Sequence, residues 1–226
     1  MKAAVITFPG SNCDRDAADA LKKLGAKVSN IWHGENKLDD NLDLIIVPGG
    51  FSYGDYLRSG AMASISPVMN EVKRLAQKGV KVLGICNGFQ ILTESGLLPG
   101  VLLRNKKMKF ICKTVNLRVE NNDSPFTKKY QKGAKIRIPI AHMDGNYFAD
   151  LETMKKLEGD GSIAFKYVDE AGNLTDEANP NGSIFNIAGI FNDRKNVLGM
   201  MPHPERAIDE SCGSEDGVLF FESLIN

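Results

Sequence analysis

Short apolar runs alternate with amphipathic stretches through the first half of the chain. Runs rich in β-branched residues are typical of buried strands, whereas apolar residues spaced three and four apart are typical of helices. This alternation predicts an α/β fold whose first strands are parallel. The expected strands are residues 3–8, 26–32, 42–47 and 80–85, and the expected helices are residues 13–24, 67–78 and 87–95.

The second half of the chain has a different pattern. Strand-like pieces follow one another with turn-forming segments between them, such as residues 120–123 and 179–182. We therefore expect antiparallel additions to the sheet, a mobile polar loop at residues 169–181, and a closing helix at residues 215–225. The expected strands are residues 110–119, 134–140, 162–168, 182–191 and 196–200.

Length and composition narrow the class of protein. The 226 residues are 42% hydrophobic, which suits one larger α/β domain spanning residues 1–226. Basic and acidic residues balance at 28 each, so a general nucleic-acid surface or membrane-binding face is not expected, and the substrate should be small. We see neither a secretory leader nor a run of about 20 apolar residues, and we expect a cytoplasmic location.

A cysteine lies between two glycines directly after one of the expected strands. In Gly84-Ile85-Cys86-Asn87-Gly88, a side chain at either glycine would collide with neighbouring elements if the strand turned sharply into a helix. The pattern is typical of a nucleophile elbow, and unpaired N–H groups at the helix N-terminus would favour a thiolate. A buried structural cysteine in an ordinary strand-to-helix turn is the alternative.

A histidine and a glutamate lie two positions apart near the end of the chain, in His203-Pro204-Glu205. Residues two apart on an extended segment project to the same side, and Pro204 disfavours a helical conformation at His203. Glu205 could therefore orient the imidazole as the third member of a nucleophile–base–orienter triad. Taken alone, the segment could also be a rigid surface loop, but its occurrence with the elbow favours catalysis.

Four segments in order resemble one protein family. The elbow around Cys86 and the later His203-Pro204-Glu205 are similar to the class I (triad) glutamine amidotransferases. More narrowly, residues 9–14, 48–58, 86–90 and 200–206 resemble the stand-alone glutaminase subunits of phosphoribosylformylglycinamidine synthase. The resemblance implies a flavodoxin-like, three-layer α/β/α fold with a mostly parallel sheet and antiparallel additions.

The resemblance also implies a reaction in purine (IMP) biosynthesis. L-Glutamine would be hydrolysed to glutamate and ammonia through a thioester on Cys86, with His203 as acid and base and Glu205 as orienter. Ammonia would pass to a large synthetase subunit, which, with a small accessory subunit, converts formylglycinamide ribonucleotide to formylglycinamidine ribonucleotide. This chain has no Walker-type loop, so no cofactor is expected in it, and ATP and Mg²⁺ are expected on the partner.

Acyl transfer also needs hydrogen-bond donors for its oxyanions. One donor should be the backbone N–H of Asn87, which follows the nucleophile. The second should come from residues 48–51, because glycines let the main chain approach a ligand closely; within this segment the resemblance points to Gly50. A plain tight turn is the alternative. The resemblance further implies that Gln90 positions the substrate, against the alternative of an amide on the helix surface.

The remaining polar segments have weaker signals. Residues 9–12 should form a turn and helix cap, with a partner-facing role as the alternative, and His33 should be a half-buried structural residue. In the loop at residues 142–147, Met143 replaces a glycine expected after His142, and this loop would line the glutamine pocket or face the partner. The basic run at residues 104–109 should be a solvated face or dock an acidic partner surface.

The other cysteines show no C-x-x-C spacing, so neither a disulfide framework nor a metal site is expected. We expect Cys13, Cys112 and Cys212 to be packing or surface thiols. Two other functions compete with the amidotransferase. A peptidase or deglycase with a cysteine elbow would place a histidine near the nucleophile, where this chain has Asn87, and a non-catalytic scaffolding subunit would not need the triad.

Overall fold

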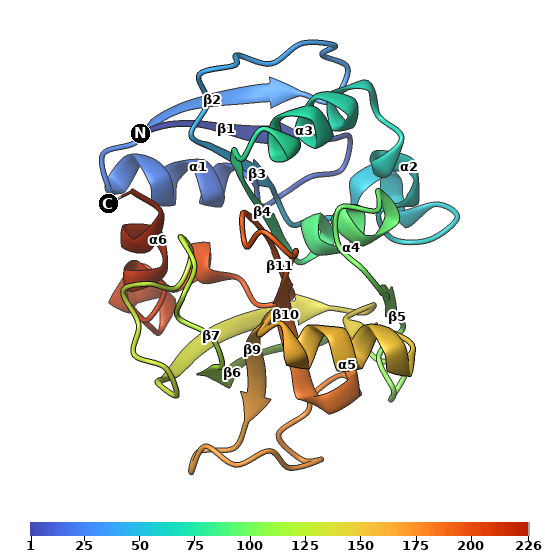
Figure 1. The fold of residues 1–226 in the computed structure, drawn as a ribbon, viewed down its shortest axis with the longest axis vertical. Coiled ribbons are helices and arrows are strands. Elements are labelled where there is room, and N and C mark those ends of the chain that lie inside the picture. The colour runs from blue at the N-terminus through green and yellow to red at the C-terminus, as the bar shows by residue number, and fades with distance from the viewer. Residues whose placement is uncertain (226) are drawn as a thin grey trace.

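The computed structural model describes residues 1–225, and within them a nine-stranded sheet passes through the whole molecule (Figure 1). Its strand order is β2-β1-β3-β4-β11-β10-β9-β6-β7, and a separate pair joins β5 to β8. Parallel ladders connect the strands from β2 to β11, and antiparallel ladders connect those from β11 to β7. The strands are β1 (Lys2–Thr7), β2 (Lys27–Trp32), β3 (Leu44–Val47), β4 (Lys81–Ile85), β5 (Val101–Leu103), β6 (Ile111–Val119), β7 (Lys135–His142), β8 (Asn146–Phe148), β9 (Ile163–Val168), β10 (Ile187–Phe191) and β11 (Val197–Met200).

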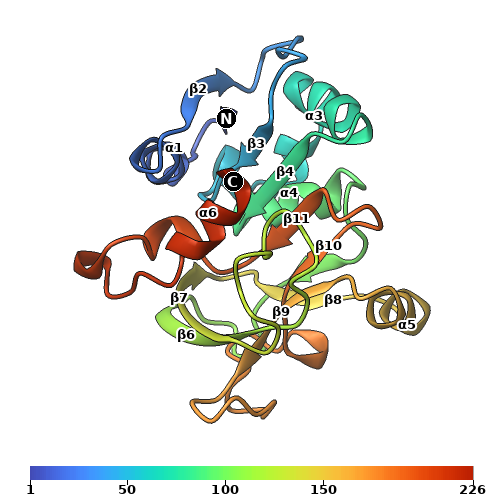
Figure 2. The same cartoon turned by 60° about the vertical axis from the view of Figure 1, so that its left-hand side comes forward.

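Helices cover both faces of the parallel part of the sheet, which gives three layers (Figure 2). Helices α1 and α6 lie on one face, and α3 and α4 lie on the other. The α-helices are α1 (Asp14–Lys23), α2 (Ala61–Ser64), α3 (Pro67–Gln77), α4 (Asn87–Glu94), α5 (Leu151–Gly159) and α6 (Val218–Ile225), and the 3₁₀ helices are η1 (Ser52–Asp55), η2 (Ile184–Asn186), η3 (Pro204–Arg206) and η4 (Glu210–Cys212). The expected α/β fold is therefore confirmed.

The sequence of the central strands explains their position. Every residue of β3, Leu-Ile-Ile-Val, is buried, as is typical of a parallel strand covered on both faces. Helix α3 begins with proline at its first turn and turns Val68, Val72 and Leu75 into the core. None of the helices in residues 1–225 combines the length and apolarity needed to cross a membrane.

Several expectations for the second half were wrong. The strand expected at residues 182–191 begins only at Ile187, because Phe185 and Asn186 adopt positive φ of 50° and 57° in η2. Helix α5 was missed, since only Met154 and Leu157 of its nine residues are buried and its apolar pattern is weak. Strand β11 pairs in parallel with β4, whereas antiparallel additions were expected, and α6 begins three residues later than expected.

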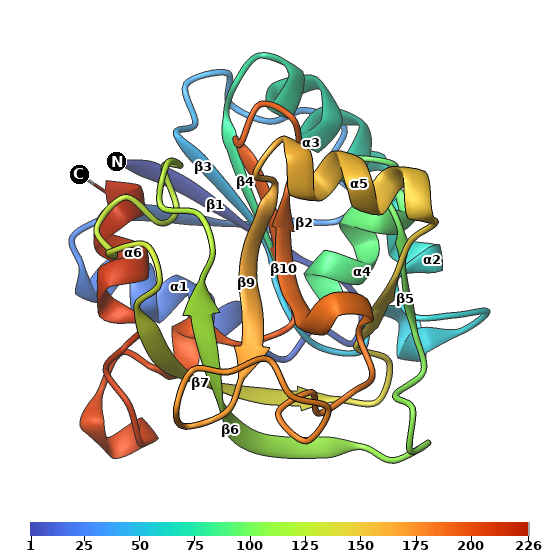
Figure 3. The same cartoon turned by 60° about the horizontal axis from the view of Figure 1, so that its bottom comes forward.

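The parallel pairing of β4 with β11 is what joins two distant parts of the chain. In this register Ile85 lies opposite Met200, and the N–H of Cys86 donates to the Met200 carbonyl at 2.8 Å. Because adjacent parallel strands end at the same edge of the sheet, the segments that follow them meet there. Figure 3 shows β1, β3 and β4 in the parallel part of the sheet, where β3 pairs with both of the others.

Candidate active site

Cys86 lies in a strained backbone conformation between β4 and α4. Its φ of 51° and ψ of −106° lie outside the regions that L-residues usually occupy. A Cβ on Gly84 would approach the Gly88 carbonyl oxygen to 2.7 Å, and one on Gly88 would overlap the carbonyl oxygen of Val47. Both glycines are therefore needed for close packing of the turn, as the elbow pattern predicts.

The position of Cys86 suits a sulfur nucleophile. The residue caps the N-terminus of α4, where unpaired N–H groups and the helix dipole stabilise negative charge. Its side chain is 5% exposed, and the sulfur lies 3.7 Å from the carbonyl oxygen of Ala141, at the end of β7. Strand β7 thus forms one wall of the site.

His203 and Glu205 form the buried pair that their spacing suggests. His203 Nδ1 lies 2.6 Å from Glu205 Oε1, and both side chains are almost fully buried. The two side chains were expected to meet because they project to the same side of an extended segment. Instead, Pro204–Arg206 forms the 3₁₀ helix η3. The backbone N–H of His203 also donates to Pro139 in β7 at 2.9 Å, which fixes the start of η3.

Charge around His203 favours its protonated form. Burial alone would lower the pKa of His203, but the neighbouring Glu205 carboxylate and the Cys86 sulfur outweigh burial and raise this pKa well above its usual value. An imidazolium beside a thiolate is the state in which a cysteine nucleophile is activated by its base. The geometry therefore brings Cys86, His203 and Glu205 together in the order expected of a triad.

The two expected oxyanion donors lie next to this triad. Gly50 has a φ of 140°, and a Cβ there would meet the Asn12 nitrogen at 2.8 Å, so only glycine fits. Asn87 is the first residue of α4, where backbone N–H groups have no partner within the helix. Its side chain accepts a hydrogen bond from the N–H of Ser52 at 3.2 Å and so joins the elbow to the segment after Gly50.

Gln90 is not the surface amide considered as an alternative. It is 5% exposed; its oxygen accepts from Asn87 Nδ2 at 2.8 Å, and its nitrogen donates to the carbonyl of Asp144 at 2.6 Å. Gln90 thus connects the elbow to the loop at residues 142–147. Its role in binding substrate stays a prediction.

The loop at residues 142–147 is held from inside the protein. His142 is buried, which lowers its pKa to about 3, and its Nε2 lies 3.1 Å from Asn181 Nδ2. Asn105 Nδ2 donates to the His142 carbonyl at 2.9 Å, and Asn105 Oδ1 accepts from the N–H of Gly145 at 3.1 Å. Sequence reasoning missed Asn105 and Asn181, because isolated asparagines in polar segments carry no pattern of their own.

Cys13 is the other residue near the triad that the sequence did not reveal. Its sulfur, a His203 nitrogen and a Glu205 oxygen all lie within 4.8 Å of one another, and Arg206 Nη2 donates to the sulfur at 3.3 Å. Cys13 itself precedes α1 without a side-chain cap, so the helix cap expected from residues 9–12 was wrong. Ser11 instead forms a β-bridge with Gly50.

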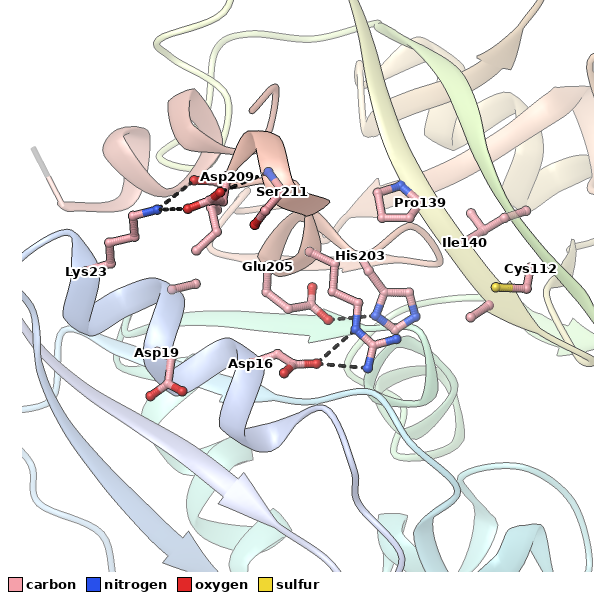
Figure 4. Close-up of a pocket in the computed structure, with 14 residues that line it drawn as sticks. Asp16, Asp19, Lys23, Cys112, Pro139, Ile140, His203, Glu205, Asp209 and Ser211 are labelled. Carbon is pink, nitrogen blue, oxygen red and sulfur yellow. Dashed lines mark hydrogen bonds and ion pairs between the residues drawn. The ribbon is translucent and has the colours of Figure 1, made fainter. Parts of the chain in front are cut away.

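A cavity of about 730 Å³ opens beside His203 and Glu205 (Figure 4). One side is formed by α1, and the other by β7 and the segment after η3. Asp16 and Asp209 lie on its wall, paired with Arg206 and Lys23 at 2.8 and 2.7 Å. The cavity ends at the His203–Glu205 pair, whose side chains are almost fully buried.

The other residues singled out in the sequence are not members of the triad. The cationic side chains between residues 104 and 109 are exposed, and Arg104 pairs with Asp144 at 3.1 Å. His33 is half-buried, as expected, with Nδ1 2.8 Å from the Tyr53 hydroxyl. Cys112 is exposed, whereas the side chain of Cys212 lies outside the described part of the structure.

Comparisons with known proteins identify the family of this chain. The family model described as the CobB/CobQ-like glutamine amidotransferase domain matches residues 1–215. The phosphoribosylformylglycinamidine synthase subunit PurQ of Novosphingobium aromaticivorans is 58% identical over 99% of this chain and 96% of that protein. The subunit of the same name from Thermus thermophilus is 55% identical over 100% of this chain and 98% of that protein.

A solved structure has the same fold. A chain in the structure of PurLQS from Thermotoga maritima superposes with a TM-score of 0.87 at 48% identity, covering 100% of this chain and 97% of that one. These matches confirm the resemblance found in the sequence. The chain therefore belongs to the PurQ family of phosphoribosylformylglycinamidine synthase subunits, which are glutamine amidotransferases.

Proposed function

We propose that this chain is the glutaminase subunit of a phosphoribosylformylglycinamidine synthase. It hydrolyses L-glutamine to glutamate and ammonia and supplies the ammonia to a synthetase subunit in purine biosynthesis. The observation that carries this proposal is the buried His203–Glu205 pair, 2.6 Å apart, beside a cysteine held in an elbow. The full-length identity of 55–58% to PurQ subunits supports the choice of pathway.

In the first half of the reaction, the Cys86 thiolate attacks the side-chain amide carbon of glutamine. The carbonyl oxygen becomes an oxyanion, which accepts hydrogen bonds from the N–H groups of Gly50 and Asn87. When the C–N bond breaks, His203 gives its proton to the departing nitrogen, and ammonia leaves. The products of this half are ammonia and a glutamyl thioester on Cys86.

In the second half, His203 acts as a base. It takes a proton from water, whose oxygen attacks the thioester carbon through a second oxyanion. Cleavage of the C–S bond releases glutamate and restores the thiolate, and the proton remains on His203. Glu205 holds the imidazole in one orientation and stabilises its cation in both halves.

The synthetase chemistry belongs to other chains. The Thermotoga maritima relative was solved as PurLQS, and we propose that this chain assembles in the same way with a large synthetase subunit and a small accessory subunit. ATP and Mg²⁺ would then bind to the large subunit, because this chain carries no Walker-type loop. We also propose a cytoplasmic location, where thiols such as Cys86 stay reduced.

Replacing Cys86 tests this division of labour. In the assembled complex, Cys86→Ala should abolish synthesis from glutamine while leaving synthesis from added ammonia intact, because the synthetase step does not use the thiol. Both rates can be measured on one preparation, with Cys112→Ala as a control for loss of a thiol outside the triad. Loss of both activities in a correctly assembled complex would overturn the proposal, and glutamine-dependent synthesis that persists would show that Cys86 is not the nucleophile.

A further inference from the structure

Three potential metal ligands meet on one side of the triad. Cys13 Sγ, a nitrogen of His203 and a carboxylate oxygen of Glu205 lie within 4.8 Å of one another, and all three residues are buried. They come from the turn before α1 and from the start of η3. A Cβ on Gly49 would lie 2.9 Å from His203 Cε1 and 3.2 Å from Cys13 Sγ, so that glycine leaves the room in which the thiol and imidazole meet.

The donor set has the chemistry of a zinc site. Zn²⁺ binds thiolate sulfur at about 2.3 Å and imidazole nitrogen or carboxylate oxygen at about 2.0–2.2 Å, which places tetrahedral ligands roughly 3–4 Å apart. Movements of about 1 Å by these side chains would close the present arrangement around one ion. Thiolate, imidazole and carboxylate together favour Zn²⁺ over Mg²⁺ or Ca²⁺, which prefer oxygen ligands.

The triad also has unused binding capacity. His203 Nε2 and Glu205 Oε2 are buried and have no hydrogen-bond partner among the described residues. Buried polar atoms are nearly always paired, so two such atoms on neighbouring side chains indicate a place where a ligand binds. In the proposed reaction His203 exchanges protons with substrate and water, and a metal ion could compete for its Nε2 atom.

The charged side chains next to Cys13 would compensate the charge of a bound divalent cation. Arg206 donates to the sulfur at 3.3 Å and pairs with Asp16 at 2.8 Å, so the charge of the guanidinium is offset. With Zn²⁺ bound and His203 in its neutral form, the Cys13 thiolate, Glu205 and Asp16 would supply three negative charges against three positive charges on the metal and Arg206. A desolvated site is stable only when its charges are compensated in this way.

A cavity ends next to two of the three ligands. His203 and Glu205 lie on the wall of the 730 Å³ cavity, and the carboxylates of Asp16, Asp19 and Asp209 line the same cavity (Figure 4). Asp16 and Asp209 are paired with Arg206 and Lys23 on the same wall, and Asp19 is paired with Lys22, so charges along the cavity are largely compensated. The side chains of His203 and Glu205 are almost fully buried, so a metal ion in the cavity would reach them once side chains at its wall move aside.

We propose that Cys13, His203 and Glu205 form an inhibitory Zn²⁺ site. Binding would release the proton of the Cys13 thiol and one proton of the His203 imidazolium to solvent, and it would leave a water molecule as the fourth ligand. The metal would occupy imidazole and carboxylate lone pairs that the triad needs, so glutamine hydrolysis would stop while the synthetase step continued. The inhibition rests on the proposed glutaminase function, but the binding does not.

Metal binding can be measured without turnover. In a Cys86→Ala background, Co²⁺ should bind and give sulfur-to-cobalt charge-transfer absorption in the near ultraviolet, which EDTA removes. A second replacement, Cys13→Ala or the closer isostere Cys13→Ser, should weaken Co²⁺ binding by at least about tenfold, since even indirect supports of a metal site contribute that much. The matched control is Cys112→Ala, which removes an exposed thiol on the same cavity.

Two outcomes of the binding experiment would overturn the site. One is charge-transfer absorption that survives both replacements of Cys13, and the other is absorption that disappears with Cys112→Ala. Circular dichroism of each variant checks that it is folded. Since no glutamine is present, these results are independent of the proposed function.

Inhibition is then measured in the assembled complex with Cys86 intact. Zn²⁺ should inhibit glutamine-dependent synthesis, and Cys13→Ala should raise the concentration for half-inhibition at least about tenfold. Synthesis from added ammonia should be unaffected in both proteins. Equal sensitivity of wild type and Cys13→Ala would mean that Cys86 and His203 alone bind the metal, and would overturn the proposal.

Discussion

At the scale of single residues, the site depends on a few buried polar groups, and their protonation depends on whether a partner of opposite charge lies beside them. Glu205 compensates the imidazolium of His203, and the cost of burying either group alone is avoided by their 2.6 Å contact. His142, a few residues from Pro139, is buried without such a partner, and burial lowers its pKa to about 3. The pKa of His203 is thus raised, whereas the pKa of His142 is lowered.

Replacing the orienting carboxylate should be less damaging than replacing the base. Glu205→Gln keeps an oxygen that can accept from the imidazole but removes the charge, so kcat should fall with little change in the KM for glutamine. In triads of this kind, loss of the third member costs roughly 10²-fold less in kcat than loss of the base. Steady-state constants of Glu205→Gln and His203→Ala in the assembled complex provide the comparison; equal losses would mean that Glu205 does more than orient His203.

His142 should make the protein sensitive to acid. Its pKa is lowered from 6.5 to about 3 on folding, so the stability it contributes is fully present above pH 6.5 and is lost as the pH falls from 6.5 towards 3. Between pH 7 and pH 5, this linkage amounts to about 2 kcal/mol. Urea unfolding of wild type and His142→Gln at both pH values should show a smaller decrease for the variant; parallel decreases would contradict a buried, neutral His142.

At the scale of elements, the positions of strand ends decide which side chains meet. The hydrophobic runs and the glycine pattern around Cys86 were enough to predict β1, β3, β4, α3 and α4, because these elements are buried and strongly periodic. Helix α5 and the turn at η2 were missed, since few residues of α5 are buried and positive φ at Phe185 leaves no mark in the sequence. Cys13 was not connected with His203 because their contact depends on how β1 and β11 are placed in the sheet.

The elbow should tolerate no side chain at Gly88. A Cβ there would overlap the Val47 carbonyl oxygen, so Gly88→Ala should push α4 away from β3 and destabilise the fold by about 1–3 kcal/mol, with a lower kcat. Gly159, in α5, is a matched control because a Cβ there meets no atom within 4 Å. Gly159→Ala should be neutral or stabilising by up to about 1 kcal/mol. Thermal unfolding of both variants tests this account, and similar melting temperatures would contradict it.

At the scale of the whole molecule, one continuous sheet carries two kinds of pairing. The parallel half presents the ends of β1, β3, β4 and β11 at one edge, and the antiparallel half brings β7 back across this edge to face Cys86. The sequence could indicate the parallel and antiparallel halves of the sheet. It could not show that β7 faces Cys86, because this depends on the strand order β10-β9-β6-β7. The glutaminase site is therefore assembled from segments throughout the chain, which explains why the family likeness extends over its full length.

The central claim is that Cys86, and not the neighbouring thiol of Cys13, carries the glutamyl group during turnover. The direct measurement is acid quenching of the assembled complex while it consumes glutamine, followed by peptide mass spectrometry. We predict one added glutamyl group on the peptide that contains Cys86, absent in His203→Ala and unchanged in Cys13→Ala. A glutamyl group on the peptide that contains Cys13, or glutamine turnover by Cys86→Ala, would contradict the account.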